Sequence, residues 1–449
     1  MAGAQEVVRA ADIVCTDSEQ RDEMPAKNIN CLEDSVLKKI FSYLKAEDLV
    51  TTIRYVCPYW RKLIYTDDLW EQVSFCPPGY MSDKEVIKFI RHMPRIKSIT
   101  ILHSRDIETL MDALCACCWD VRKIIVRCKA SLNHAMIRRT LKTFPNLTTF
   151  EVMISGSKLY LDYAKAYAKQ LRARTLKTIQ RSRDFSINKT VSRRRCILQC
   201  IIITCKMTSQ MFKILCTVKY LKLLFVYNID KDVFSIDIKP LENLQHLESL
   251  QLVHFKNSRW CKSASVLTGN VLFLKLTKLE IIDAGPMVSS AVNYLLRRCP
   301  NLKLLNLQEN NFTDSLLEDV SFCKDLEYLD VSNNGQLTNR FIENIADNCR
   351  KLNFLDISNC SLMTDKFILI LQTCRDLEVL HLEGSNFMGL YFHCIPFLYP
   401  KLAELNVKHF ECMFVIYDIK MEMPHLRVKN CTCMQDEKIG LKFDDVLLA

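Results

Sequence analysis

The residues in this sequence that are best suited to catalysis or metal binding are its 22 cysteines. Cys115 and Cys118 form a C-x-x-C pair, but a closed zinc site needs four ligands and no second such pair follows. Gly384 and Gly389 have the spacing of a phosphate-binding loop, yet Leu390 stands where that loop requires lysine. No nucleophile elbow, zinc-protease helix or calcium loop occurs. We therefore expect no catalytic residues, no metal and no cofactor, and so a protein that is not an enzyme.

Many of the cysteines instead recur at fixed places in a repeating pattern. Cys205 and Cys360 stand eight residues after the first apolar position of an L-x-x-L-x-L segment, where other copies have Asn310 or Asn334. Five others stand three residues before that position: Cys118, Cys299, Cys323, Cys349 and Cys374. Thiols that recur at the same position of each repeat are expected to pack in the core. The side chains eight residues after the first apolar position are expected to form hydrogen bonds in the turn.

The clearest copies of this pattern begin at Leu302, Leu326, Leu352, Leu377 and Leu402, with spacings of 24 to 26 residues. Weaker copies begin at Leu276, Leu247, Leu221, Ile197, Leu176, Leu147, Val121 and Ile96, which makes about thirteen units, and a degenerate last one begins at Leu426. Alternating apolar residues predict one short strand in each unit. The pairs Thr313-Asp314, Thr338-Asn339 and Thr364-Asp365 predict a capped helix after the strand. No such unit buries its own apolar face, so the units must stack.

The pattern resembles the cysteine-containing subclass of leucine-rich repeats. This resemblance implies an α/β solenoid with parallel strands on its concave face and helices on its convex face. We expect the repeats to occupy residues 76–430, with a C-terminal tail at 431–449.

A different pattern precedes the repeats. Residues 1–27 show mixed charge and little periodicity, which is typical of a flexible tail. Between residues 28 and 75, apolar residues at helical spacing predict three short helices. The order of residues from Asn30 to Phe75 resembles the F-box family: the opening Leu32, the V-L-x-x-I-F-x-Y-L helix, Asp48-Leu49, Val56-Cys57-x-x-Trp60 and Leu69-Trp70.

This second resemblance implies the substrate receptor of an SCF-type (Skp-cullin-F-box) ubiquitin ligase. Its F-box binds a Skp-type adaptor, and through it cullin and RING subunits, while the repeats bind a protein substrate. The family's adaptor-contacting positions fall on Leu32, Val36, Ile40, Leu44, Leu49, Val56, Trp60 and Trp70. The alternative is that these side chains only form the core of the module. Two positions depart from the family pattern: Glu33 replaces the usual proline, and Pro58 replaces a basic residue.

In each unit, the side chains two, four and six residues after the first apolar position are predicted to lie on the concave face. The C-terminal units are polar and partly acidic there, and the middle units are apolar. We therefore expect substrate to bind across Ile203, Phe225, Tyr227, Asp330, Asp356 and His381. The alternative is that the middle units are out of phase and that Phe225 is a core residue.

The net charge of +10 is concentrated in a basic stretch from Lys165 to Arg195. A solvated loop, a surface for an acidic partner and a nuclear import signal all fit this stretch. No aromatic platform interleaves its charges, so nucleic acid, above all a single strand, is not the expected partner. A ligase-independent binding protein or nuclear scaffold that uses this stretch is the alternative function. With no signal peptide and no apolar span, we expect a protein of the cytoplasm or nucleus without a membrane partner.

Overall fold

The computed structural model describes residues 29–128, 133–153, 198–205, 207–228, 235–255, 259–261, 272–285, 289–316, 318–385, 387–407 and 413–429. The chain divides into two compact units, Met1–Cys205 and Lys206–Ala449. Throughout the described ranges, every helix is too short or too polar to cross a membrane. The segments 1–27, 165–195 and 431–449 and the repeat start at Leu176 lie outside the described residues.

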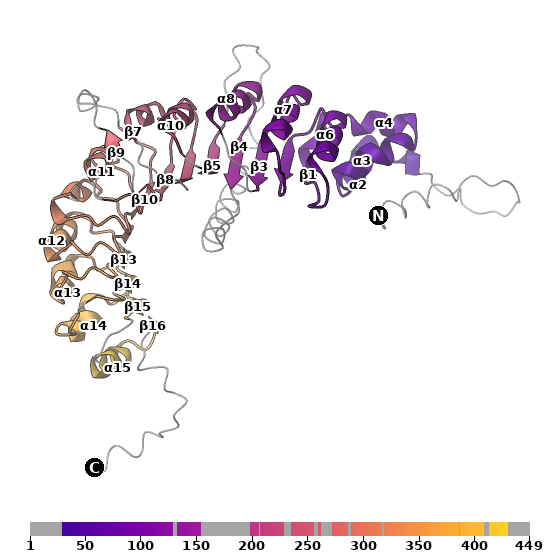
Figure 1. Ribbon diagram of the computed structural model, residues 1–449. Coiled ribbons are helices and arrows are strands. Elements are labelled where there is room, and N and C mark those ends of the chain that lie inside the picture. Colours follow the sequence, from indigo (N-terminus) through magenta and orange to yellow (C-terminus); the bar gives the residue numbers. More distant parts are fainter. Residues whose placement is uncertain are drawn as a thin grey trace, which may run out of the picture. The chain divides into compact units, whose positions relative to one another are not determined.

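The N-terminal unit begins with a cluster of short helices, drawn in indigo in Figure 1. Four of them are α-helices rather than the predicted three, because Leu69 and Trp70 lie on a helix of their own. The elements are η1 (Ile29–Cys31), α2 (Asp34–Phe41), α3 (Ala46–Thr51), η2 (Ile53–Tyr55), α4 (Pro58–Ile64) and α5 (Asp67–Gln72). Pro58 begins α4, where a missing N–H costs nothing, and the Cys57 sulfur accepts a hydrogen bond from the Trp60 N–H. The proline that departs from the family pattern therefore suits the start of its helix.

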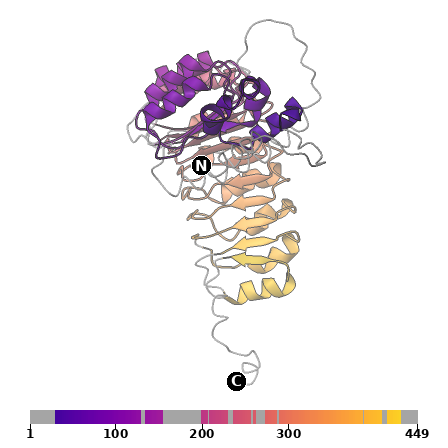
Figure 2. The ribbon, with the colours of Figure 1, turned by 90° about the vertical axis from the view of Figure 1, so that its right-hand side faces the viewer.

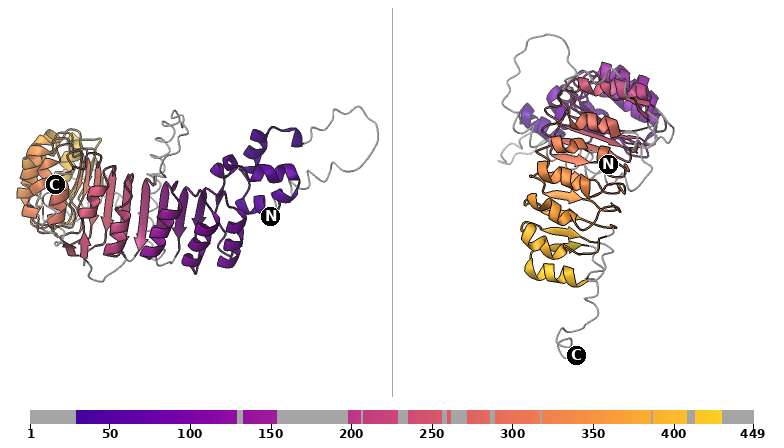
Figure 3. Two further views of the ribbon diagram at one scale, coloured as in Figure 1. Left: turned by 90° about the horizontal axis from the view of Figure 1, so that it is seen from above. Right: turned by 90° about the vertical axis from the view of Figure 1, so that its left-hand side faces the viewer.

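The same unit continues as a parallel sheet with helices on one of its faces (Figure 3, left). Its strands pair in chain order: β1 (Ser74–Phe75), β2 (Ser98–Ile101), β3 (Lys123–Arg127), β4 (Thr149–Met153) and β5 (Cys200–Cys205). The helices between them are α6 (Asp83–His92), α7 (Ile107–Cys117) and α8 (His134–Thr143). β4 pairs directly with β5, so no strand lies between these two in the sheet.

The C-terminal unit repeats the same arrangement, with strands stacked on one side and helices on the other (Figure 2). Its parallel strands are β6 (Leu223–Asn228), β8 (Ser249–Val253), β10 (Lys278–Ile282), β11 (Leu304–Asn306), β12 (Tyr328–Asp330), β13 (Phe354–Asp356), β14 (Val379–His381), β15 (Glu404–Asn406) and β16 (Arg427–Lys429). The α-helices are α10 (Ser209–Leu215), α11 (Ser289–Leu296), α12 (Asn339–Asn348), α13 (Phe367–Ile370), α14 (Ile395–Leu398) and α15 (Met413–Glu422). The 3-10 helices are η3 (Lys239–Asn243), η6 (Asp314–Leu316), η7 (Glu318–Phe322), η8 (Leu371–Thr373) and η9 (Phe392–Cys394), and β7 (Ser235–Asp237) pairs with β9 (Arg259–Cys261).

The strand register confirms most of the predicted repeat phase. Leu305, Leu329, Leu355, Leu380 and Leu405 pair in one row and are fully buried, as are the first apolar positions from Leu302 to Leu402. Side chains of the same strands that flank this row lie on the face without helices, which we call the open face. The predicted leucine-rich-repeat solenoid is therefore the observed fold.

One unit is out of phase with the prediction. Ile201 and Ile203 pair with Phe150 and Val152, and all four side chains are fully buried. The first core position of this unit is therefore Leu198, one residue later than Ile197. Since strand side chains alternate between faces, a shift of one residue moves Ile203 into the core. The prediction that Ile203 faces a substrate is wrong.

The turns after β11 and β12 are each closed by a buried asparagine, as the repeat pattern predicted. The Asn334 amide donates to the carbonyls of Leu307, Val331 and Ser332, and its Oδ1 accepts the N–H of Phe312. Asn310 makes the equivalent set of hydrogen bonds one repeat earlier. These side chains join consecutive repeats, because each contacts the backbone of its own unit and of the one before.

The predicted capping residues have a second role. Thr338 caps α12 by accepting a hydrogen bond from Arg340 N–H, as expected. Asp314 and Asp365, however, accept hydrogen bonds from the backbone of the following repeat, at Thr338 and at Met388 and Leu390. These two carboxylates therefore link neighbouring units instead of capping their own helices.

Candidate protein-binding surfaces

The helical module at residues 29–75 has a core of its own, built around two tryptophans. Trp60 packs edge-on against Phe41 at 5.0 Å, and its Nε1 donates to Asn30 Oδ1. Trp70 donates from Nε1 to the Ile64 carbonyl. Leu49, Trp60 and Trp70 are at most 2% exposed. These three side chains form the core of the module and are not at its surface, so the alternative of a purely structural role holds for them.

The other predicted contact residues lie at the surface. Leu32, Val36 and Val56 are 38–42% exposed, and Ile40 and Leu44 are partly buried. On α2, Val36 and Ile40 form a stripe beside the buried stripe of Leu37 and Phe41. Contact with an adaptor stays a prediction for these five residues.

Sequence reasoning missed two aromatic residues on the same module. Tyr43 is 79% exposed and Tyr55 is 61% exposed. Lys39 lies over the ring of Tyr43, and Arg54 lies over that of Tyr55. The signal that could have found them is their position next to the predicted contacts Leu44 and Val56. We call Leu32, Val36, Tyr43, Tyr55 and Val56 together the module patch.

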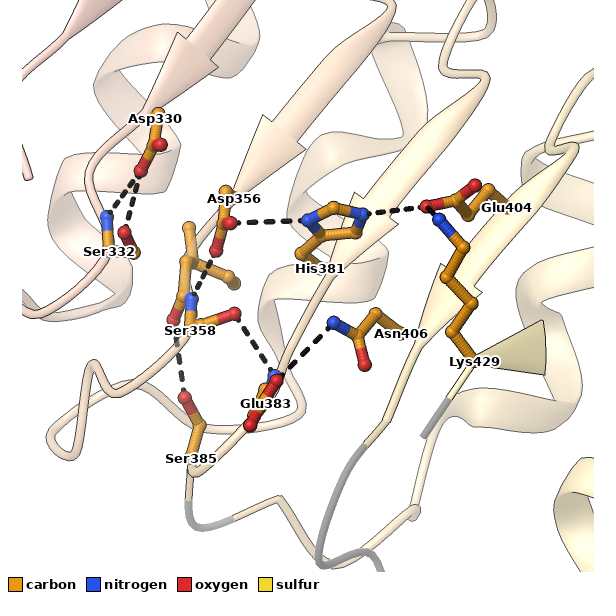
Figure 4. Close-up of polar contacts among 11 residues, drawn as sticks. Asp330, Ser332, Asp356, Ser358, His381, Glu383, Ser385, Glu404, Asn406 and Lys429 are labelled. Carbon is orange, nitrogen blue, oxygen red and sulfur yellow. Dashed lines mark hydrogen bonds and ion pairs between the residues drawn. The ribbon is translucent and has the colours of Figure 1, made fainter. Parts of the chain in front are cut away.

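A second candidate surface lies on the open face of the C-terminal unit, where polar side chains follow the strand register (Figure 4). Asp330, Asp356 and His381 occupy equivalent positions on β12, β13 and β14. His381 Nδ1 lies 3.2 Å from Asp356 Oδ2, and Nε2 lies 3.0 Å from Glu404 Oε1. Lys429 forms an ion pair with the same Glu404 oxygen. Asp356 and His381 therefore form a pair, and the contact with Glu404 lets His381 link β13, β14 and β15.

These contacts shift the acidity of the groups involved. Burial raises the pKa of Asp330 to about 6, with the neighbouring Asp356 carboxylate adding to the shift and hydrogen bonds from Ser332 opposing it. Burial lowers the pKa of His381, but its hydrogen bonds to Asp356 and Glu404 outweigh burial and the net pKa is raised. The surface is thus negative where Asp330 and Asp356 meet and more nearly balanced towards β16.

Aromatic rings lie beside the carboxylates on the same face. Tyr328 and Phe354 stack with ring centroids 4.0 Å apart and planes 8° from parallel. Phe354 meets the His381 ring edge to face at 5.2 Å. Tyr328, Phe354, Asp356 and His381 are all partly exposed, so a binding partner can reach them.

The middle strands offer less surface than predicted. Leu224 and Val226 are the core positions of β6, so Phe225 is on the open face, as expected, and the alternative phase is excluded. Phe225 is nevertheless only 4% exposed. Tyr227 is partly exposed and stacks on His254 at 5.6 Å. Of this pair, Tyr227 is the better placed to contact a partner.

The cysteines at the repeat phase are buried, as their pattern predicted. Cys299, Cys323, Cys349 and Cys374, which we call the cysteine ladder, lie one repeat apart and are fully buried. The Cys349 thiol donates to the Val320 and Cys323 carbonyls, and that of Cys374 to the Cys349 carbonyl. Burial raises the pKa of Cys323 and Cys349 to about 12, so their reactive thiolate form is suppressed. Within the described ranges, no three His, Cys, Asp or Glu side chains come together in a way that could hold a metal ion.

Comparison with known proteins first defines the fold. An internalin (inlF) from Listeria monocytogenes is similar with a TM-score of 0.50 and 14% identity, over 85% of this chain and 93% of its own. A chain of the yeast Rad7–Elc1 complex has a TM-score of 0.37 and 13% identity, over 90% and 94%. The leucine-rich-repeat protein LIC12759 of Leptospira interrogans has a TM-score of 0.37 and 17% identity, over 71% and 68%. No curated protein matches the sequence. At 14% identity the likeness to the internalin shows the fold alone.

The helical module has a match of its own. Residues 33–76 match the family model described as F-box-like. The match covers α2 to α5 and strand β1, and so includes most of the module patch. The chain is therefore an F-box-like module followed by leucine-rich repeats, two folds that typically serve as adaptor and binding modules.

Proposed function

We propose that this protein is the substrate-recognition subunit of an SCF-type ubiquitin ligase. In this role the F-box-like module binds a Skp-type adaptor, which connects the chain to cullin and RING subunits. The repeats bind a protein substrate and hold it for ubiquitination and degradation. The protein contributes proximity and no catalytic group of its own, and it acts in the cytoplasm, the nucleus or both.

The observation that carries this proposal is the module patch. A module of this size has few apolar side chains to spare, because its core must bury Leu37, Phe41, Leu49, Trp60 and Trp70. Even so, six apolar or aromatic side chains stay exposed on it, namely the five of the module patch and Tyr59. Apolar exposure on short helices is typical of a protein-binding surface. The F-box-like match supports a Skp-type adaptor as the partner of this surface.

Co-purification of the full-length chain with a Skp-type adaptor tests the proposal. We expect the wild-type protein to bind, and Val36→Asp combined with Val56→Asp to abolish binding, because the charges would be buried at the interface. Tyr80→Ser is the matched control, since Tyr80 is 89% exposed and precedes α6, outside the patch. Wild-type protein that does not bind the adaptor would refute the ligase assignment and favour the scaffold alternative.

A further inference from the structure

We propose that the open face of β12, β13 and β14 binds a basic segment of a protein partner, and that the carboxylates of Asp330 and Asp356 hold one of its lysine or arginine side chains. Calling this partner a substrate rests on the proposed function, whereas the chemistry of the surface does not. Figure 4 shows the two carboxylates on adjacent strands, with His381 on the next.

The first step concerns what the fold itself needs at this position. Asp330 Oδ1 accepts the Ser332 N–H, and Asp356 Oδ1 accepts the Ser358 N–H. On β11 the same position is Asn306, whose Oδ1 accepts the Gln308 N–H at 3.2 Å. A neutral amide is therefore sufficient to close this turn. Closing the turn therefore does not require the negative charges of Asp330 and Asp356.

The second step concerns the cost of those charges. Register neighbours on adjacent strands lie about 4.8 Å apart, so the two carboxylates repel each other. Asp330 is also 7% exposed and thus poorly hydrated. The raised pKa of Asp330 agrees with this arrangement. A cation from outside would relieve the repulsion.

The third step concerns the cations that are already present. Neither Asp330 nor Asp356 forms an ion pair with lysine or arginine in the described part of the chain, and His381 is the one basic partner of Asp356. Lys429 is paired with Glu404 instead. A basic segment is the complementary partner.

The fourth step concerns the length of the bound side chain. Tyr328 and Phe354 stand two residues before the carboxylates on the same strands and the same face. They supply apolar surface for the aliphatic stem of lysine or arginine, while its charged end reaches the two carboxylates. Arginine fits better than lysine, because its planar guanidinium can donate to both carboxylates at once.

Selection of peptides from a random linear library on the full-length protein tests this proposal. We expect enriched peptides to share arginine or lysine at one fixed position. Their affinity should fall roughly tenfold or more on the double variant Asp330→Asn/Asp356→Asn, since charge-assisted hydrogen bonds are lost. Asp325→Asn is the control, because it removes the same charge at a site paired with Lys351.

Three outcomes would overturn the proposal: no enriched peptide, enriched peptides without a fixed basic residue, or equal binding to the wild type and the double variant. Circular dichroism checks that the double variant is folded, which Asn306 at the equivalent position leads us to expect. Adaptor binding by the double variant should equal that of the wild type. If the wild-type protein does not bind the adaptor, the ligase role is refuted, but the proposal for this surface still stands.

Discussion

Replacement of Asp330 by asparagine should make the protein more stable at neutral pH. Asp330 titrates at about 6 in the folded protein, against 3.8 for an ordinary aspartate. One pKa unit corresponds to about 1.4 kcal/mol, so charging this carboxyl costs the folded state on the order of 1–3 kcal/mol at pH 7.5. Asparagine keeps the turn, as Asn306 shows, and removes the charge.

The pH dependence follows from the direction of the shift. The folded state binds the Asp330 proton more tightly than the unfolded state, so wild-type stability falls as the pH rises from about 4 to about 6. The advantage of the variant should therefore be largest above pH 6 and smaller by about half near pH 5. Below pH 4 it should vanish.

Urea unfolding of the full-length protein at pH 5 and at pH 7.5 measures both effects. The control is Asp325→Asn, at an exposed carboxylate whose pKa is lowered by its hydrogen bond and ion pair with Lys351. That variant should be neutral or slightly destabilised. The reasoning is refuted if the Asp330→Asn protein is no more stable than the wild type at pH 7.5, or if it is equally stabilised at both pH values. Either result would show that the charge of Asp330 does not destabilise the folded state.

Three further predictions concern the turns and the thiols of the repeats. Gly384→Ala should destabilise the protein by about 1–3 kcal/mol, because φ is +70° and the new Cβ would lie 1.9 Å from Asn359 Oδ1. The control is Gly335→Ala, whose new Cβ would lie 3.3 Å from its nearest neighbour. The control should change the melting temperature little, and Gly384→Ala should lower it. Asn334→Ala should cost roughly 2–4 kcal/mol in urea unfolding, since it removes three buried hydrogen bonds donated by the amide and the acceptor of the buried Phe312 N–H. In a maleimide time course at pH 7.5, exposed Cys76 should react well before the cysteine ladder, and equal rates would contradict the packing role of the ladder.

The sequence predicted the repeats well wherever leucines alternate with polar residues. From Leu302 to Leu402 the alternation sets both the strand and its face, and the register agrees. Residues 197–203 instead form a nearly continuous apolar run, ILQCIII. Such a run reads equally well in two phases, and only pairing with β4 shows that Ile203 points into the core.

The helical module shows a different limit. Helical spacing grouped Val36 and Ile40 with Leu37 and Phe41 as one stripe. The structure separates them into an outer and an inner stripe on neighbouring faces of α2, a division that depends on where Trp60 packs. Similarly, the contact of His381 with Glu404 joins different positions on adjacent strands, which a repeat alignment alone does not reveal.

On the open face of the C-terminal unit, one row of residues in register shows which residue types the fold requires and which it does not. In this row Asn306 on β11 and Asn406 on β15 flank Asp330, Asp356 and His381, which stand at positions with the same register. If the turn alone determined the residue, the least costly choice would be asparagine throughout, since it closes the turn without charge repulsion. Asp330 is therefore a residue at which this row gives up stability. A cationic partner would recover that stability on binding, which is why the Asp330→Asn variant should gain stability and lose its basic ligand together.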